Sequence, residues 1–507
     1  MLWLAAANVI LWSLLPLAVE GSLRLDAAEG QIGGAFWMLS YTKHPPIWQW
    51  LIAASKLTGE FRYFTVYFAG QLCAVGAFCF LAWGVWREYG ALPAALTMAL
   101  GLVSPFASYV PIQVNPNIVL MPFWAVALWA GYWAFEGGKL KHWMLFGISV
   151  GLAIWAKYAI LHLVLPLGVL FLCVPAYRAQ LWTPRPWIAA LAAFALVVPH
   201  AVSVASDNFE SLHYATRTFV TSATEKLGLS GNFLMNAVIL NAIMALICGA
   251  TFGLRPIWAA VRKGLSRHAS RMDVYLHVAA FGPVLVVIAS PLFDARPRAL
   301  WITPFVLGFA LWWTHFTASS GAQLKVWRLR PVTIAGMGLF LAGYMLARLT
   351  GPAVTGLAGY PEMDGRALAH LAETAWQTYD KGPIPYLIGL PDQRGRHAVG
   401  SIAFDLPYRV ATIDDIGRTT PTWVDLEDLT RRGALVVAVG ELPKDLQFLS
   451  STVLPVGTFI RPTTRGVTRK RFISFGILPK RTDPLPAADQ MQLGERSLRP
   501  SWQQAHY

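Results

Sequence analysis

Residues 24–50 read RLDAAEGQIGGAFWMLSYTKHPPIWQW and follow directly on a first apolar segment, residues 2–19. The stretch begins with two carboxylates, Asp26 and Glu29, and ends beyond a Lys-His-Pro-Pro turn that starts at Lys43. Ionisable residues this close to hydrocarbon are costly, so they are candidates for function. The stretch therefore predicts a membrane protein with a charged loop after its first helix.

The composition supports a membrane protein of many spans. The chain has 507 residues, of which 55% are hydrophobic and only 13% are charged. Soluble domains carry about 25% charged residues. We therefore expect a mainly α, polytopic membrane protein with a small C-terminal α/β domain.

Eleven segments are apolar over nearly the length of about 20 residues that a spanning helix needs. They are residues 2–19, 63–86, 91–110, 117–135, 143–157, 159–176, 187–205, 233–254, 273–291, 299–316 and 332–349. Only Lys157 and Tyr158 separate the fifth from the sixth, and one long helix there would invert the orientation of everything that follows.

The charge of the loops favours a break at Lys157. With that break and an external first loop, the inner loops hold most of the loop Lys and Arg residues, as the positive-inside rule requires. With eleven spans, the C-terminal part then lies on the external side of the membrane. Basic loops beside a bilayer indicate contact with anionic membrane lipids rather than with nucleic acid.

The chain from residue 351 onward, which we call the tail, differs in character from the preceding part. Residues 1–350 hold 23 Lys and Arg against 11 Asp and Glu, whereas the tail holds 18 against 16. Residues 362–379 predict an amphipathic helix, and four short segments predict strands: PIPYLIGLP, YRVATI, GALVVAVG and TVLPVGTFI. We expect a transmembrane core of residues 1–350, an external α/β domain of residues 351–481 and a disordered end of residues 482–507.

Asp26 and Glu29 have a structural and a functional interpretation. Structurally, Asp26 could cap a helix, with Glu29 three residues later in a pattern that resembles a capping box. Functionally, a carboxylate could take the proton of an attacking hydroxyl, or hold a metal ion beside a phosphate. Spacing alone favours the cap.

The loop after these acids contains a second group of candidates. Two prolines fix an extended turn but leave Lys43 and His44 unexplained. Residues 47–59 are amphipathic and too short to span, which predicts an interfacial helix with Trp48 and Trp50 at headgroup level.

Further candidates lie at the predicted outer ends of spans. Asn115 and Asn117 begin one span, and helix capping by Asn117 is as good an explanation as substrate contact. The structural interpretation of Lys157 is that its side chain extends from a helix end to the membrane surface. Asp294, Arg296 and Arg298 form a cluster in which the arginines suit a phosphate or carboxylate ligand.

The stretch HPPIWQWL, the acids before it and the lysine after the corresponding helix resemble the GT-C-type membrane glycosyltransferases that use polyprenyl-phosphate sugars. This group includes protein O-mannosyltransferases, aminoarabinose transferases of lipid A and bacterial galacturonosyl transferases. The resemblance covers residues 20–350 by topology and motif order, and the tail resembles the external domain of bacterial members.

The resemblance implies an inverting transfer of sugar from a polyprenyl-phosphate donor to an envelope glycan or glycolipid outside the bacterial inner membrane. Asp26 or Glu29 would be the base, although many members have adjacent Asp-Glu where this chain has the two acids three apart. The donor phosphate would meet Lys157, Lys43, His44, Arg296 and Arg298, and the substrate pocket would include Tyr158, Asn115 and Asn117. No cofactor is firmly implied, and a divalent cation is one option.

Three alternatives remain at this point. A protein O-mannosyltransferase-like enzyme would share the core and differ in its acceptor. A transporter or flippase would also show charges among many spans, but we find neither inverted repeats nor paired broken helices. A membrane scaffold that only displays the tail would not need Asp26, Glu29 and Lys157.

Overall fold

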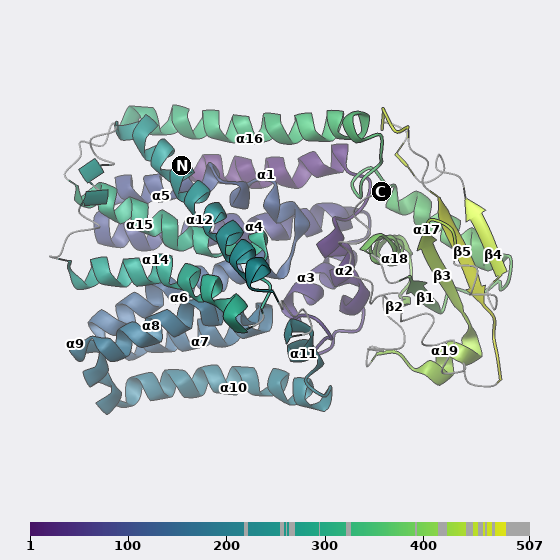
Figure 1. Cartoon of the computed structure of the whole chain (residues 1–507), viewed down its shortest axis with the longest axis horizontal. Coiled ribbons are helices and arrows are strands. Elements are labelled where there is room, and N and C mark those ends of the chain that lie inside the picture. The colour runs from purple at the N-terminus through teal and green to yellow at the C-terminus, as the bar shows by residue number, and fades with distance from the viewer. Residues whose placement is uncertain are drawn as a thin grey trace.

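The computed structural model of the chain describes residues 1–216, 222–253, 258–259, 261–262, 269–293, 295–320, 326–390, 393–413, 423–442, 450–454, 460–461, 464–468 and 472–482. Long helices run roughly parallel to one another in one half of the molecule, and a β-sheet lies beyond one end of them (Figure 1). Between the two lie short helices, among them α2 and α18.

Seven helices in the described part of the chain are long and apolar enough to cross a membrane. They are α1 (Leu2–Val19), α4 (Arg62–Tyr89), α6 (Pro116–Gly137), α10 (Pro184–Ser206), α12 (Ala223–Phe252), α14 (Arg271–Ala289) and α16 (Val326–Thr355). The prediction of a mainly helical, multi-pass membrane protein with a small sheet is confirmed.

The remaining four predicted spans correspond to shorter helices, so the count of eleven is not established. They are α5 (Ala91–Leu102), α7 (Leu140–Ala156), α8 (Leu161–Cys173) and α15 (Phe305–Ser319). Hydropathy counts apolar residues, but 3₁₀ turns that contain proline follow α5, and another 3₁₀ turn precedes α15, so these two helices are shorter than their apolar segments. The segment containing α8 bends by 96° into the segment that begins with α9 (Pro175–Arg178), and together they make at most one further span.

Short helices cover the end of the bundle that faces the sheet. These are α2 (Leu25–Gly34), α3 (Ile47–Lys56) and α11 (Glu210–Thr216). The interfacial helix predicted from residue 47 exists as α3, but its Trp48 is only 1% exposed. The indole packs in the protein core and hydrogen-bonds the backbone there, and its level in the membrane stays a prediction.

The tail folds around a five-stranded sheet with strand order β2-β1-β3-β5-β4. The elements are α17 (Gly365–Gln377), β1 (Tyr386–Gly389), α18 (Gln393–Asp405), β2 (Ala411–Ile413), α19 (Leu426–Arg432), β3 (Ala434–Val439), β4 (Ser450–Leu454) and β5 (Ile473–Leu478). β1 pairs parallel with β2 and β3, whereas β5 runs antiparallel to both β3 and β4. Residues of α17 and α18 pack on one face, where Leu368 and Ile402 join Leu387 and Leu435 of the strands in one buried cluster.

Of these elements, α17 and four of the strands were predicted from the sequence, whereas α18 and β5 were not. The division into a core of residues 1–350 and a domain of residues 351–481 stays a prediction. Residues 483–507, which make up nearly all of the predicted disordered end, lie outside the described residues.

Candidate functional site

Helix α2 carries both acids of the first loop, and neither of them caps it. The N-cap residue is Arg24, whose side chain makes no capping hydrogen bond, and Asp26 is the second residue of the helix. The capping-box interpretation of Asp26 and Glu29 is therefore wrong. The two side chains have partners elsewhere, and these partners define a site.

Asp26 is linked to Lys157 through the first turn of α6. The amide nitrogen of Asn115 donates to Oδ2 of Asp26 over 3.2 Å. Asn115 is also the N-cap of α6, where its Oδ1 accepts from the backbone N–H groups of Asn117 and Ile118. Asn117, for which helix capping and substrate contact were both open, accepts from Nζ of Lys157 over 2.5 Å. The cap is Asn115, so the capping interpretation of Asn117 is wrong.

Lys157 stands at a break in the helical bundle. It follows the last residue of α7 and has extended backbone, with φ −169° and ψ 136°, before a 3₁₀ turn leads into α8. Its ammonium lies 5.5 Å from the centre of the Trp301 ring, in cation–π geometry. The predicted break at Lys157 is confirmed, and the ammonium is held by side chains from two other segments.

Glu29 lies between cations from two distant parts of the chain. Nζ of Lys43 is 3.1 Å from Oε1 of Glu29, and Nη1 of Arg396 is 3.8 Å from Oε2. Lys43 was predicted, but Arg396 lies on α18 in the tail and was missed. Glu29 therefore joins the first loop to the tail through its two ion pairs.

The electrostatics of Asp26 and His44 reflect burial among these charges. Burial, and after it the charge of Glu29, raises the pKa of Asp26, while Asn115, Lys157 and Arg298 act in the opposite direction. Burial, with Lys157 next in importance, lowers the pKa of His44 to about 3, so its ring is neutral near pH 7. His44 can therefore offer a hydrogen bond to a phosphate but not a charge.

The two predicted arginines, Arg296 and Arg298, have different surroundings. Arg298 lies near enough to Asp26, His44 and Lys157 to influence their titration. Arg296 instead forms an ion pair with Glu225 in the first turn of α12. Asp294, the third member of the predicted cluster, lies outside the described residues.

Tyr158 follows Lys157 in the chain but has different partners. Its hydroxyl meets Nε2 of His200 at 2.9 Å and Oγ of Ser211 at 3.1 Å. Nδ1 of His200 donates to the carbonyl oxygen of Leu39 over 2.6 Å. Tyr158 thus joins α10, α11 and the first loop, in a network for which the sequence offered only isolated histidines.

We call Asp26, Glu29, Lys43, His44, Asn115, Asn117, Lys157 and Arg298 the acid–lysine cluster. Among the residues that the structure describes, no three His, Cys, Asp or Glu side chains converge as a metal site would require. The cluster offers two carboxylates, and Glu29 is already engaged by cations. We assign no step to a divalent cation.

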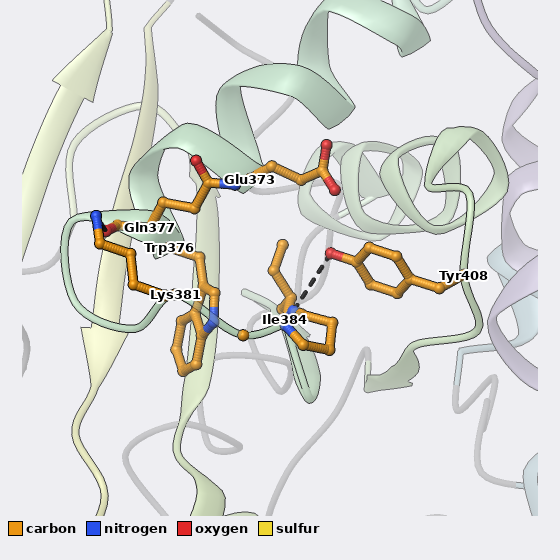
Figure 2. Close-up of a pocket in the computed structure, with 8 residues that line it drawn as sticks. Glu373, Trp376, Gln377, Lys381, Ile384 and Tyr408 are labelled. Atoms are coloured by element: carbon orange, nitrogen blue, oxygen red, sulfur yellow. Dashed lines mark hydrogen bonds between the residues drawn. The ribbon is translucent and has the colours of Figure 1, made fainter.

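A cavity of about 180 Å³ lies apart from this cluster, in the tail. Figure 2 shows it between the end of α17 and the segment before β1, with the hydroxyl of Tyr408 accepting from the N–H of Ile384 over 3.3 Å. Its lining consists of Glu373, Trp376, Gln377, Lys381, Gly382, Pro383, Ile384 and Tyr408. None of these belongs to the acid–lysine cluster.

Comparison with known proteins identifies relatives of one kind. Residues 43–202 match the family described as dolichyl-phosphate-mannose-protein mannosyltransferase. The lipid A galacturonosyltransferase RgtD of Rhizobium johnstonii is 25% identical over 319 residues, which are 60% of this chain and 64% of RgtD. The lipopolysaccharide core galacturonosyltransferase RgtA of the same organism is 23% identical over 348 residues, covering 65% of this chain and 67% of RgtA. The first match thus spans slightly less than two thirds of the relative.

The fold has a solved counterpart. Over 94% of this chain and 97% of the other, the structure aligns with ArnT from Cupriavidus metallidurans bound to undecaprenyl phosphate, with a TM-score of 0.61 and 14% identity. The resemblance to these glycosyltransferases that the sequence indicates is confirmed, and the fold matches that of ArnT. The family segment includes Lys43, His44, Asn115, Asn117 and Lys157, while Asp26 and Arg298 lie outside it.

Proposed function

We propose that this relative of the GT-C membrane glycosyltransferases moves a sugar from a polyprenyl-phosphate donor to a hydroxyl of lipid A or the lipopolysaccharide core. The observation that carries the proposal is the chain of contacts from Asp26 through Asn115 and Asn117 to Lys157. These contacts connect the carboxylate of Asp26 and the ammonium of Lys157 through the first turn of α6. The loop charges support an active site on the outer face of the bacterial inner membrane.

The reaction is a single displacement with inversion. Asp26 takes the proton of the acceptor hydroxyl as its oxygen bonds to the anomeric carbon. The bond between that carbon and the phosphate oxygen breaks, and the electron pair leaves with the polyprenyl phosphate. Lys157 and Arg298 stabilise the charge that develops there, and the neutral ring of His44 offers a hydrogen bond.

Asp26 suits the base better than Glu29. Burial and the neighbouring Glu29 raise the pKa of Asp26, which makes it a better proton acceptor than an ordinary aspartate. Glu29 is instead paired with Lys43 and Arg396. Glu29 therefore acts as a fixed negative charge that strengthens Asp26. Arg296 and Tyr158 have no part in this mechanism because their described contacts lie elsewhere.

A uronic acid is the sugar that the site suits best. Four cations, Lys43, Lys157, Arg298 and Arg396, stand against the two carboxylates of α2. A phosphodiester-linked neutral sugar brings one negative charge, whereas a uronosyl donor brings a second on its carboxylate. The two curated relatives are both named galacturonosyltransferases, which supports the same sugar class.

The description of the matching family favours one alternative, a protein acceptor. Purified enzyme in nanodiscs should be given polyprenyl-phosphate galacturonic acid with either lipid A and core oligosaccharide or an unfolded protein acceptor. We expect label on the glycolipid and none with Asp26→Asn. Label on protein alone would establish the alternative. No transfer from either a uronosyl or a neutral hexosyl donor would refute the proposed function.

A second experiment tests the acceptor in the cell. Mass spectrometry of lipid A and core oligosaccharide should show one uronic acid fewer in a strain that lacks this protein than in its parent. A neutral hexose in its place would correct the sugar but keep the reaction.

A further inference from the structure

Helix α18 of the tail lies directly against α2, the helix that carries the acids (Figure 1). The contact is between backbones. A Cβ atom placed on Gly400 would lie 2.2 Å from the carbonyl oxygen of Ala28, a distance that no side chain tolerates. Glycine at this position lets the two helices approach more closely than any other residue would.

Two side chains of α18, His397 and Arg396, contact the chain before and after Asp26. Nε2 of His397 donates to the carbonyl oxygen of Leu23 over 2.7 Å, in a fully buried contact. Nη1 of Arg396 lies 3.8 Å from Oε2 of Glu29. Leu23 is three residues before Asp26 and Glu29 is three residues after it. The tail therefore contacts Leu23, just before α2, and Glu29 within α2, and these two residues lie on either side of Asp26 in the sequence.

The other end of α18 is anchored to the core. Asp405, whose side chain is fully buried, accepts from Arg62 over 2.9 Å and from the hydroxyl of Tyr63 over 2.6 Å. Nζ of Lys56 donates to the carbonyl oxygens of Ala403 and Tyr408. A buried carboxylate with two strong partners is costly to separate from them. Helix α18 is thus fixed to α3 and α4 at one end and to α2 at the other.

We propose that α18 is part of the transfer site and that Arg396 is a positioning residue that acts on the reaction through Glu29. The inference rests on the proposed function for its chemistry. The groups that face Glu29 are Asp26 on its own helix, Lys43 and His44 in the first loop, and Arg396.

Arg396 and Lys43 take different oxygens of the Glu29 carboxylate, which fixes its orientation. The negative charge of Glu29 raises the pKa of Asp26. Without Arg396, less of that charge is compensated, so the pKa of Asp26 rises further. The enzyme then loses activity at a higher pH than the parent does.

The test compares Arg396→Ala with Arg396→Lys and with a matched control, Arg366→Ala. Arg366 also joins the tail to the core, through Glu60, but these side chains are 60% and 79% exposed and lie outside the acid–lysine cluster. We expect Arg396→Ala to lower kcat about tenfold, to leave the donor KM within about twofold, and to move the acidic limb of the rate profile to higher pH. Arg396→Lys should restore most of the rate, and Arg366→Ala should match the parent.

Hydrogen exchange of the α2 amides gives a readout that does not depend on activity. Exchange over residues 25–34 should be faster in Arg396→Ala and in Gly400→Ala than in Arg366→Ala. Unchanged α2 exchange in both variants would overturn the proposal, whether or not the parent transfers sugar. Parental kcat and pH profile in Arg396→Ala would overturn it as well, as would a lysine variant no better than alanine. An inactive parent would count against the proposed function alone.

Discussion

Trp48 donates its indole N–H to the carbonyl oxygen of Val114 over 2.5 Å, and Val114 has left-handed backbone with φ 40° and ψ 69°. A β-branched residue in this region is a genuine outlier and costs on the order of 1–3 kcal/mol. The next residue is Asn115, which caps α6 and contacts Asp26. The indole N–H therefore stabilises the backbone conformation that directs Asn115 towards Asp26.

Trp48→Phe should lower the rate of transfer about three- to tenfold, because one buried hydrogen bond is worth about 0.5–1.5 kcal/mol. Trp50→Phe is a matched control in the same helix, since it loses an indole bond to the carbonyl oxygen of Met38 instead. The measurement is kcat with purified variants in nanodiscs. Equal rates for the two variants would contradict a special role for the Val114 carbonyl.

Asp26→Asn should reduce kcat by about 10²–10⁴-fold, the usual cost of removing a general base. Glu29→Gln should cost much less, because Glu29 only supplies a charge to Asp26. Single-turnover rates with a labelled lipid-linked sugar would measure both. A larger loss for Glu29→Gln than for Asp26→Asn would exchange the two roles.

The rate should fall on acidification within a range above the ordinary aspartate pKa of about 3.9. The pKa of Asp26 is raised, so its basic form is present above that raised value and is lost as the pH falls through it. Asn115→Ser should move this limb to still higher pH, because the amide donor that lowers the pKa of Asp26 is gone. Serine keeps an N-cap for α6, so stability should change little. A limb unmoved by Asn115→Ser would separate Asp26 from the titration.

Lys157→Ala should raise the donor KM about 10–100-fold, as expected for the loss of a hydrogen bond to a charged group, worth about 1.5–3 kcal/mol. Lys157→Arg should keep part of the activity, because the charge remains while its geometry changes. Donor KM and melting temperature should be measured on the same detergent-purified variants. Loss of activity that follows melting temperature alone would assign Lys157 a structural role.

Arg298→Ala and Arg296→Ala should behave differently although the residues are two apart. Arg298 is close to Asp26 and Lys157, so its removal should weaken donor use about tenfold. Arg296 pairs with Glu225 in a contact where both side chains are partly exposed, so its loss should cost under about 1 kcal/mol of stability and leave the donor KM unchanged. The two KM values decide the comparison.

Much of the site was predictable because its members lie in recognisable places. Asp26, Lys43, His44 and Lys157 are ionisable groups within or beside apolar segments, where each is costly and so conspicuous. Asn115 and Asn117 were both found, but their roles depend on where α6 begins, and a shift of two residues reassigned the cap.

Arg396 had no comparable signal. It lies in a polar helix far along the chain, and only the packing of Gly400 on Ala28 brings it to Glu29. The number of spans could not be predicted from the sequence either. Hydropathy does not show where proline and 3₁₀ turns shorten a helix such as α5.

The contact between α2 and α18 joins segments that are synthesised at very different times. His397 follows Leu23 by 374 residues. At about 5–20 residues per second, roughly 20–75 s separate their emergence. Throughout that interval the early helices can already be inserted in the membrane, whereas α2 has no α18 to pack against. On the proposed function, the ability to act on a donor therefore arises late in biosynthesis, because a chain that stops before α18 lacks part of the proposed site.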